Sequence, residues 1–146
     1  MADANYESLR LENQLCFPLY AASREVIKQY RPWLDALELT YTQYVAMMVL
    51  WEHQKISVKE LGQRLFLDSG TLTPVLKSLE AKGFLTRHRS SEDERVLIVE
   101  LTDEGRMLRN RALSVPGHVA ACIKLTPEEA MQLYQLLYKV LGGVNE

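Results

Sequence analysis

Apolar side chains recur at helical spacing in the first third of the chain and predict two helices there. The first helix is expected to end near Tyr30-Arg31-Pro32, with Pro18 in its first turn or at a kink. The second begins at Thr40, whose hydroxyl suits an N-cap. The periodic apolar residues are Leu15, Leu19, Ala22 and Val26 in the first helix, and Tyr44, Met47, Met48 and Trp51 in the second.

The middle of the chain carries the signals of two short helices in close succession. Ser57 and Glu60 have the spacing of a capping box, which predicts a helix from Ser57 to about Leu65. Asp68 suits the N-cap of the next helix, and Gly83 suits its end. Two short helices with so brief a link predict a helix-turn-helix. The second helix has a buried stripe of Leu72, Val75, Leu76 and Leu79, and an opposite face of Gly70, Thr73, Pro74 and Lys77.

Two segments rich in β-branched and apolar residues follow, at 84–89 and 95–101, with a polar run at 90–94 between them. They predict a two-stranded hairpin. A hairpin directly after a helix-turn-helix is a wing, whose tip can reach a minor groove while the helix enters the neighbouring major groove.

Two further helices are expected at the C-terminal end of the chain. One starts at Thr102, runs to about Val115 and breaks at Pro116-Gly117. The other starts at Thr126, where Thr and Glu129 have capping-box spacing and proline takes the first helical position. Its apolar stripe is Leu133, Leu136, Leu137, Val140 and Leu141.

The element order predicts a mainly α (α+β) fold, a winged helix-turn-helix with a two-stranded wing. With 146 residues and 47% hydrophobic content, the chain has room for a single packed domain. Its N-terminus lacks an apolar leader and no stretch is long enough to span a bilayer, so we expect a cytoplasmic protein.

Charge is distributed unevenly, which changes what the overall balance implies. A net charge of −2 argues against nucleic acid, because phosphate binding needs lysine and arginine. Residues 54–89, however, hold seven basic residues against three acidic ones, so this segment carries +4 and the remainder −6. A basic segment in an acidic frame favours DNA binding through one face.

The basic segment, the small outward residues and the following hairpin together favour a DNA-reading function over two ordinary amphipathic helices. Lys77, Arg87 and Arg89 are the expected phosphate contacts. Arg95 is the expected minor-groove probe, oriented by Asp93 through a charge-assisted hydrogen bond. The residues expected to approach the bases and backbone closely are Ser69, Thr71, Thr73 and Pro74.

The two cysteines, Cys16 and Cys122, are too few for a disulfide framework or a paired-cysteine zinc site. A lone cysteine is by default a buried, inert thiol. For Cys16 two features favour reactivity instead. It is expected near a helix N-terminus, which favours the thiolate, and several tyrosines in nearby elements can donate hydrogen bonds to sulfur. Those tyrosines are Tyr20, Tyr30, Tyr41 and Tyr44.

No catalytic set, metal site or cofactor motif is evident in the sequence. The histidines, His53, His88 and His118, lack the mutual spacing of metal ligands. Asp68-Ser69-Gly70 lacks the flanking glycine of a nucleophile elbow. We therefore expect neither an enzyme nor a bound cofactor.

Four stretches carry a family likeness across nearly the whole chain: LENQLCF at 11–17, LTYTQY at 39–44, VKELGQRLFLDSGTLTPVLKSLE at 58–80 and DER at 93–95. On these the chain resembles the MarR family of bacterial regulators, and within it the organic hydroperoxide sensors. The DSGTLTP run and the cysteine inside LENQLCF are the specific parts of this likeness.

The resemblance implies a homodimer on a pseudo-palindromic DNA operator, with half-sites about 10 bp apart. It implies a single MarR-type domain over 1–146, with the winged helix-turn-helix at about 40–101 and dimerisation helices at about 9–31 and 103–143. It also implies a repressor of peroxide-defence genes that leaves DNA when an organic hydroperoxide oxidises Cys16. Tyr30 and Tyr41 match the tyrosines that bond the sensor sulfur.

Cys122 lies about where two-cysteine members keep a resolving thiol. It either resolves Cys16 of the other subunit or takes no part, in which case a small-molecule thiol traps the oxidised sulfur.

Three other functions stay open beside the one that the resemblance implies. The first is a MarR-type repressor released by a small phenolic ligand. The second is a thiol peroxidase with Cys16 as nucleophile, for which no catalytic surround is evident. The third is a protein-interaction module, which would leave the basic segment unexplained.

Overall fold

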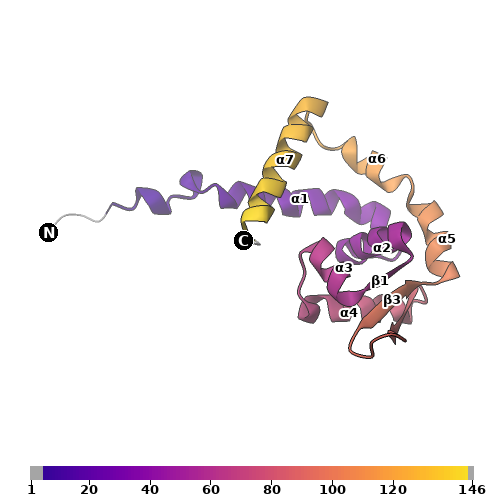
Figure 1. Ribbon diagram of the computed structural model, residues 1–146. Helices are drawn as coiled ribbons and strands as arrows, with labels where there is room; N and C mark the ends of the chain where they lie inside the picture. The colour runs from indigo at the N-terminus through magenta and orange to yellow at the C-terminus, as the bar shows by residue number, and fades with distance from the viewer. Residues whose placement is uncertain (1–4, 145–146) are drawn as a thin grey trace.

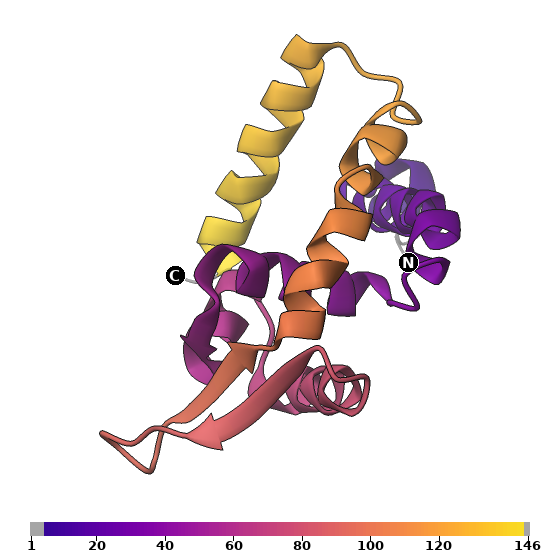
Figure 2. The ribbon, with the colours of Figure 1, turned by 90° about the vertical axis from the view of Figure 1, so that its right-hand side faces the viewer.

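The computed structural model describes residues 5–144 (Figures 1 and 2). Two 3₁₀ turns, η1 (Glu7–Leu9) and η2 (Leu11–Asn13), precede the first helix. The helices are α1 (Cys16–Asp35), α2 (Tyr41–His53), α3 (Val58–Leu65), α4 (Ser69–Ala81), α5 (Asp103–Ala112), α6 (Val115–Ala120) and α7 (Pro127–Val144). The strands are β1 (Lys55–Ser57), β2 (Leu85–Arg89) and β3 (Leu97–Leu101).

Helices α2 to α4 and the sheet form a winged helix-turn-helix, which confirms the predicted fold class. The sheet is antiparallel with the order β1-β3-β2, and the hairpin of β2 and β3 projects from the rest of the chain as the wing (Figure 2). The stripe predicted for α4 faces inward, and Leu72, Leu76 and Leu79 are fully buried. They pack in one core with residues of α2, α3, β3 and α5.

Short polar side chains fix where the helices begin, mostly as the sequence predicts. The Asp68 carboxylate accepts from the Thr71 amide at 2.7 Å, and Thr126 forms the expected reciprocal box with Glu129. Ser57 completes only half of its expected box. Its hydroxyl accepts from the Glu60 amide at 3.1 Å, whereas the Glu60 carboxylate lies 3.8 Å from Arg64.

Two predicted boundaries are wrong, and one strand was not predicted. Helix α1 continues through Pro32 to Asp35, because burial of Leu34 against the core favours a further turn that the missing proline amide does not prevent. Pro116 and Gly117 lie inside α6, where proline in the first turn has no helical hydrogen bond to lose. The third strand β1 has only three residues, too few for an alternating pattern to stand out.

The N-terminal half of α1 and the length of α7 extend beyond the winged core (Figure 1). Both carry apolar side chains that face solvent in the single chain. On and before α1 these include Leu15, Phe17, Leu19 and Tyr20, and on α7 they include Leu133, Tyr134, Leu136, Tyr138 and Val140. None of the helices between residues 5 and 144 has the length and apolar composition needed to cross a membrane.

Candidate nucleic-acid interface and thiol site

The outward face of α4 presents the small polar residues that the sequence singles out. Ser69, Thr71, Pro74 and Lys77 are exposed, and Thr73 is half-buried. The Thr73 hydroxyl donates to the Ser69 carbonyl at 2.7 Å, which leaves its lone pairs available to a donor from outside. The face therefore lets a nucleic acid come close to the helix backbone.

The wing tip holds Arg95 in the arrangement that the sequence predicts. The guanidinium donates to both carboxylate oxygens of Asp93, from Nε at 3.0 Å and from an Nη at 3.2 Å, and the Arg95 amide donates to the same carboxylate at 3.0 Å. These bonds, the side-chain ones above all, hold the pKa of Asp93 below its usual range. The Arg95 side chain is nevertheless 90% exposed, so it is oriented and still accessible.

Arg87 differs from the other expected phosphate contacts. Its guanidinium donates to Glu80 from Nε at 3.3 Å and from an Nη at 3.1 Å, and its amide donates to the same carboxylate at 2.8 Å. These bonds lower the pKa of Glu80, and the Arg87 side chain is only 20% exposed. Arg87 thus ties α4 to β2 and is engaged in the protein itself. Lys77 and Arg89 are exposed and form no ion pair within the described residues.

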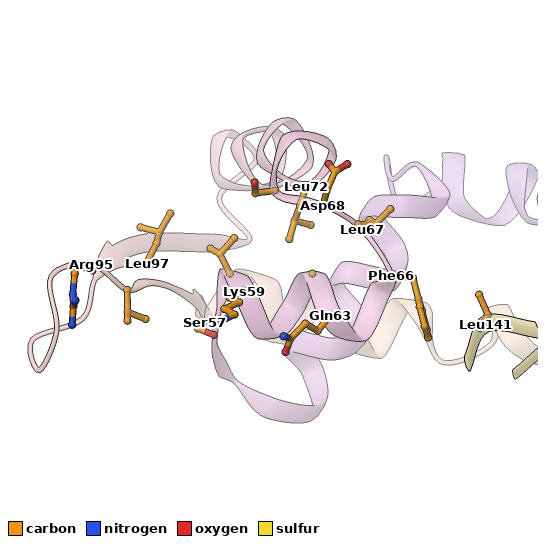
Figure 3. A pocket seen from close by; sticks show the side chains of 14 residues that line it. Ser57, Lys59, Gln63, Phe66, Leu67, Asp68, Leu72, Arg95, Leu97 and Leu141 are labelled. Carbon is orange, nitrogen blue, oxygen red and sulfur yellow. The ribbon is translucent and has the colours of Figure 1, made fainter. Parts of the chain in front are cut away.

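An open groove of about 1060 Å³ lies between α3, the start of α4 and the wing (Figure 3). Lys59, Asp68 and Arg95 supply charge to its lining, and Phe66 and Leu141 line its far end. Leu141 belongs to α7, so the groove reaches from the wing to the C-terminal helix. It borders the start of α4 and the wing on one side.

Cys16 is exposed, contrary to the default expectation of a buried thiol. It is the first residue of α1, and no side chain caps that end of the helix among the described residues. The thiol therefore stands at a helix N-terminus, on the part of α1 that projects from the core (Figure 1).

Tyr30, Tyr41 and Tyr44 form an aromatic cluster where α1 meets α2. The ring centroids of Tyr30 and Tyr41 are 4.9 Å apart, and those of Tyr30 and Tyr44 are 5.9 Å apart. Burial above all, and then the neighbouring phenols of Tyr30 and Tyr138, raise the pKa of Tyr41. Its phenol therefore keeps its proton and can act as a hydrogen-bond donor.

Cys16 and the tyrosine cluster are far apart within one chain. Tyr30 follows Cys16 by 14 positions along α1, which is about 21 Å at the rise of an α-helix. A hydrogen bond between them inside one protomer is excluded.

Cys122 is exposed just beyond α6, and its thiol lies 3.5 Å from the His118 carbonyl oxygen. The His118 ring stacks on Trp33 with centroids 3.7 Å apart. Trp33 is in the last turn of α1, about 26 Å along the helix axis from Cys16. A disulfide needs Cα atoms within roughly 7 Å, so the two cysteines of one chain cannot pair.

The chain matches known transcriptional regulators in sequence and in fold. Residues 28–111 match the family model described as transcriptional regulator SarA/Rot. The chain is 49% identical to the organic hydroperoxide resistance transcriptional regulator of Bacillus subtilis over 97% of its own length and 96% of that protein. The chain belongs to the MarR family of transcriptional regulators. Like these relatives, this MarR-family protein is a DNA-binding regulator and not an enzyme, as the sequence predicts.

Two further relatives of this MarR-family regulator complete the comparison. SarZ of Staphylococcus epidermidis is 41% identical, over 88% of this chain and 87% of that protein. The structure of reduced AbfR bound to DNA superposes with a TM-score of 0.77 at 36% identity, covering 96% of this chain and 98% of AbfR. Overoxidised AbfR bound to DNA superposes with a TM-score of 0.76 at the same identity.

Two polar contacts of this MarR-family regulator were not found by sequence reasoning. One is the ion pair between Glu80 and Arg87. The other is the hydrogen bond from the buried Gln43 side chain to Ser78 of α4, which is 2.9 Å long. The Thr40–Gln43 spacing of a capping box was the available signal for Gln43.

Proposed function

We propose that the protein is a cytoplasmic homodimeric repressor of peroxide-defence genes, and that it leaves its operator when an organic hydroperoxide oxidises Cys16. The observation that carries the proposal is the exposed Cys16 thiol at the first position of a projecting helix, in a chain with a complete DNA-reading head. The relation to the organic hydroperoxide resistance regulator supports the choice of oxidant.

A second copy of the chain supplies what one protomer lacks. The apolar stripes on α1 and α7 are exposed in the single chain, and apolar patches of this kind mark protein interfaces. A two-fold dimer of these helices turns the two reading heads toward successive major grooves of a pseudo-palindromic operator.

The same two-fold arrangement can complete the sensor. Cys16 is too far from Tyr30 and Tyr41 of its own chain, so the phenols that bond its sulfur come from Tyr30 and Tyr41 of the partner subunit. Phenols that keep their protons are suitable donors to a thiolate. Cys16 and Cys122 of one chain are too far apart to pair. The cysteine that could resolve Cys16 is therefore Cys122 of the partner subunit.

The oxidation step is a displacement at oxygen. The Cys16 thiolate attacks the terminal oxygen of the hydroperoxide, an S–O bond forms and the O–O bond breaks. The alkoxide leaves and takes a proton to become an alcohol, so sulfur is oxidised to the sulfenic acid while the peroxide is reduced. A second thiolate then attacks the sulfenic sulfur, and hydroxide leaves and takes up a proton as water.

Disulfide formation is the step that we assign to DNA release. AbfR has been solved bound to DNA in both a reduced and an overoxidised form, so added oxygen atoms are compatible with DNA binding in that relative. A disulfide places a second group against α1 and requires the surrounding helices to move. The second thiol is that of Cys122 of the partner subunit or a small-molecule thiol.

The proposal predicts that Cys16→Ser abolishes the response to peroxide. A duplex selected by the protein from a randomised DNA library serves as operator, and its affinity is measured by fluorescence anisotropy with and without cumene hydroperoxide, in the presence of glutathione. Wild type should weaken about tenfold or more, a usual size for coupling between two sites, and Cys16→Ser should not change.

Cys122→Ser is the matched control, because it removes the other exposed thiol. With glutathione present it should respond as wild type does. Equal weakening of wild type and Cys16→Ser would contradict the sensor assignment. Titration of the reduced, operator-bound protein with salicylate tests the alternative function, in which a phenolic ligand bound in the groove beside α3 releases the DNA.

A further inference from the structure

The tyrosine cluster and the reading helix are joined by one buried polar side chain, Gln43. It is 7% exposed and is the one polar or charged side chain that is buried among the residues whose burial is described. It lies in the first turn of α2, two residues after Tyr41 and directly before the buried Tyr44. A movement of the tyrosine cluster would therefore displace the first turn of α2, in which Gln43 lies.

The Gln43 amide group bonds in two directions. Its Oε1 accepts from the Thr40 amide at 3.0 Å, which completes the capping box of α2, and also from Nζ of Lys82 at 3.2 Å. Its Nε2 donates to Oγ of Ser78 at 2.9 Å. Ser78 is in the C-terminal half of α4, and Lys82 is the C-cap residue of that helix.

Lys82 extends the link to the turn between α1 and α2. Its ammonium group also donates to the carbonyl oxygen of Glu38, a residue held in the left-handed region at φ 57°. This turn directly follows α1, the helix that begins at Cys16. Ser78 and Lys82 thus make polar contacts with the first turn of α2 and with the turn after α1. These two segments flank the cluster of tyrosines.

Apolar residues of α2 and α4 also pack in one core, among them Met47, Leu72 and Leu76. Apolar packing resists separation but has little directional preference, whereas hydrogen bonds between buried groups fix one register. The amide of Gln43 is the element that can make α4 follow α2.

We propose that Gln43 is a positioning residue that transmits the oxidation state of Cys16 from the tyrosine cluster to the reading helix, through its bonds to Ser78 and Lys82. This inference rests on the proposed function, because it requires that the tyrosine cluster responds to oxidation. Because its side chain is buried, we assign Gln43 no direct contact with the peroxide or the DNA. Its substitution should change the difference between the reduced and oxidised affinities more than it changes the reduced affinity.

The test measures operator affinity before and after oxidation for wild type, Gln43→Met, Gln43→Glu and Ser78→Ala, together with the thermal unfolding of each. Methionine keeps the length of the side chain but bonds to neither helix. Glutamate keeps acceptors for the Thr40 amide and for Lys82, and it can accept from the Ser78 hydroxyl. Val49→Ala is the matched control, since it truncates a half-buried core contact of α2 and leaves the polar link intact.

Gln43→Met should bind the operator within about threefold of wild type when reduced, and its affinity should fall less than about threefold on oxidation, against about tenfold or more for wild type. Gln43→Glu and Val49→Ala should respond as wild type does, although Val49→Ala melts at a lower temperature. Ser78→Ala should lose part of the response to oxidation. It takes the place of Gln43→Met as the test variant if Gln43→Met does not fold.

An unchanged ratio of reduced to oxidised affinity in both Gln43→Met and Ser78→Ala, with wild type responding, would overturn the inference and leave the proposed function standing. Loss of the response in Val49→Ala to the same extent as in the link variants would also overturn it, because general destabilisation would then explain the effect. A wild type that does not respond would overturn the proposed function and this inference with it.

Discussion

Gly105→Ala is expected to lower the free energy of unfolding by about 3 kcal/mol, at the upper end of the usual cost of overpacking. A Cβ atom at this position would lie 2.1 Å from the carbonyl oxygen of Phe84 and 2.7 Å from a methyl carbon of Leu101. The first contact is with backbone, so α5 must move away from the sheet. That movement strains the bond from Trp51 Nε1 to the Gly105 carbonyl, 2.8 Å long, which joins α2 to α5.

The measurement is equilibrium unfolding of the reduced protein in urea, followed by circular dichroism. Gly117→Ala is the control, because a Cβ atom there meets nothing within 4 Å and alanine favours a helix over glycine by about 1 kcal/mol. The two variants should shift the unfolding midpoint in opposite directions. A Gly105→Ala protein that unfolds at the wild-type midpoint would refute the close packing of α5 against the sheet.

Leu136→Glu is expected to convert the dimer to a monomer and to weaken operator binding by about 100-fold or more, because two linked reading heads gain that much over one. Leu136 is 60% exposed in the single chain and lies within the apolar stripe of α7. If that stripe is the dimer interface, glutamate would bury an unpaired charge there, which two associating helices do not tolerate.

Light scattering on a sizing column gives the mass, and anisotropy gives the affinity. Met48→Glu is the matched control, since Met48 is 43% exposed on α2, outside both dimerisation segments. It should stay dimeric and bind DNA as wild type does. A Leu136→Glu variant that remains a dimer with full affinity would mean that α7 is not part of the interface.

Local signals in the sequence were sufficient for the helix caps, the wing tip and the buried stripe of α4. Asp68 and Thr126 cap the helices that they precede, and Asp93 and Arg95 pair across two residues at the wing tip. Each of these contacts lies within a few residues of chain, so spacing and chemistry alone predict it. The stripe of α4 was equally readable, because one helix face is buried over three turns.

Contacts between elements that are far apart in the sequence were harder to predict. Arg87 looked like a phosphate contact because its charge was visible and its partner was not; Glu80 meets it only after α4 and β2 pack together. Pro32 looked like a helix end because the burial of Leu34 on the core is a tertiary effect. The burial of Gln43 against Ser78 is likewise a tertiary effect that no local pattern indicates.

The sensor shows the limit most clearly. A resemblance associates Cys16 with Tyr30 and Tyr41, but the rise of α1 separates them within one chain. Only an arrangement of two chains can bring them together, and no spacing in a single sequence encodes that.

Paired measurement of Cys16 oxidation and operator binding in one sample tests the central claim most directly. Reduced protein on a labelled operator receives increasing cumene hydroperoxide with glutathione present. Anisotropy gives the bound fraction, and mass spectrometry of the quenched sample gives the Cys16 forms as thiol, disulfide and sulfinic acid. The account predicts that the bound fraction falls in proportion to the Cys16 disulfide. An operator still fully bound when Cys16 is entirely in the disulfide form, or released while Cys16 remains a thiol, would contradict it.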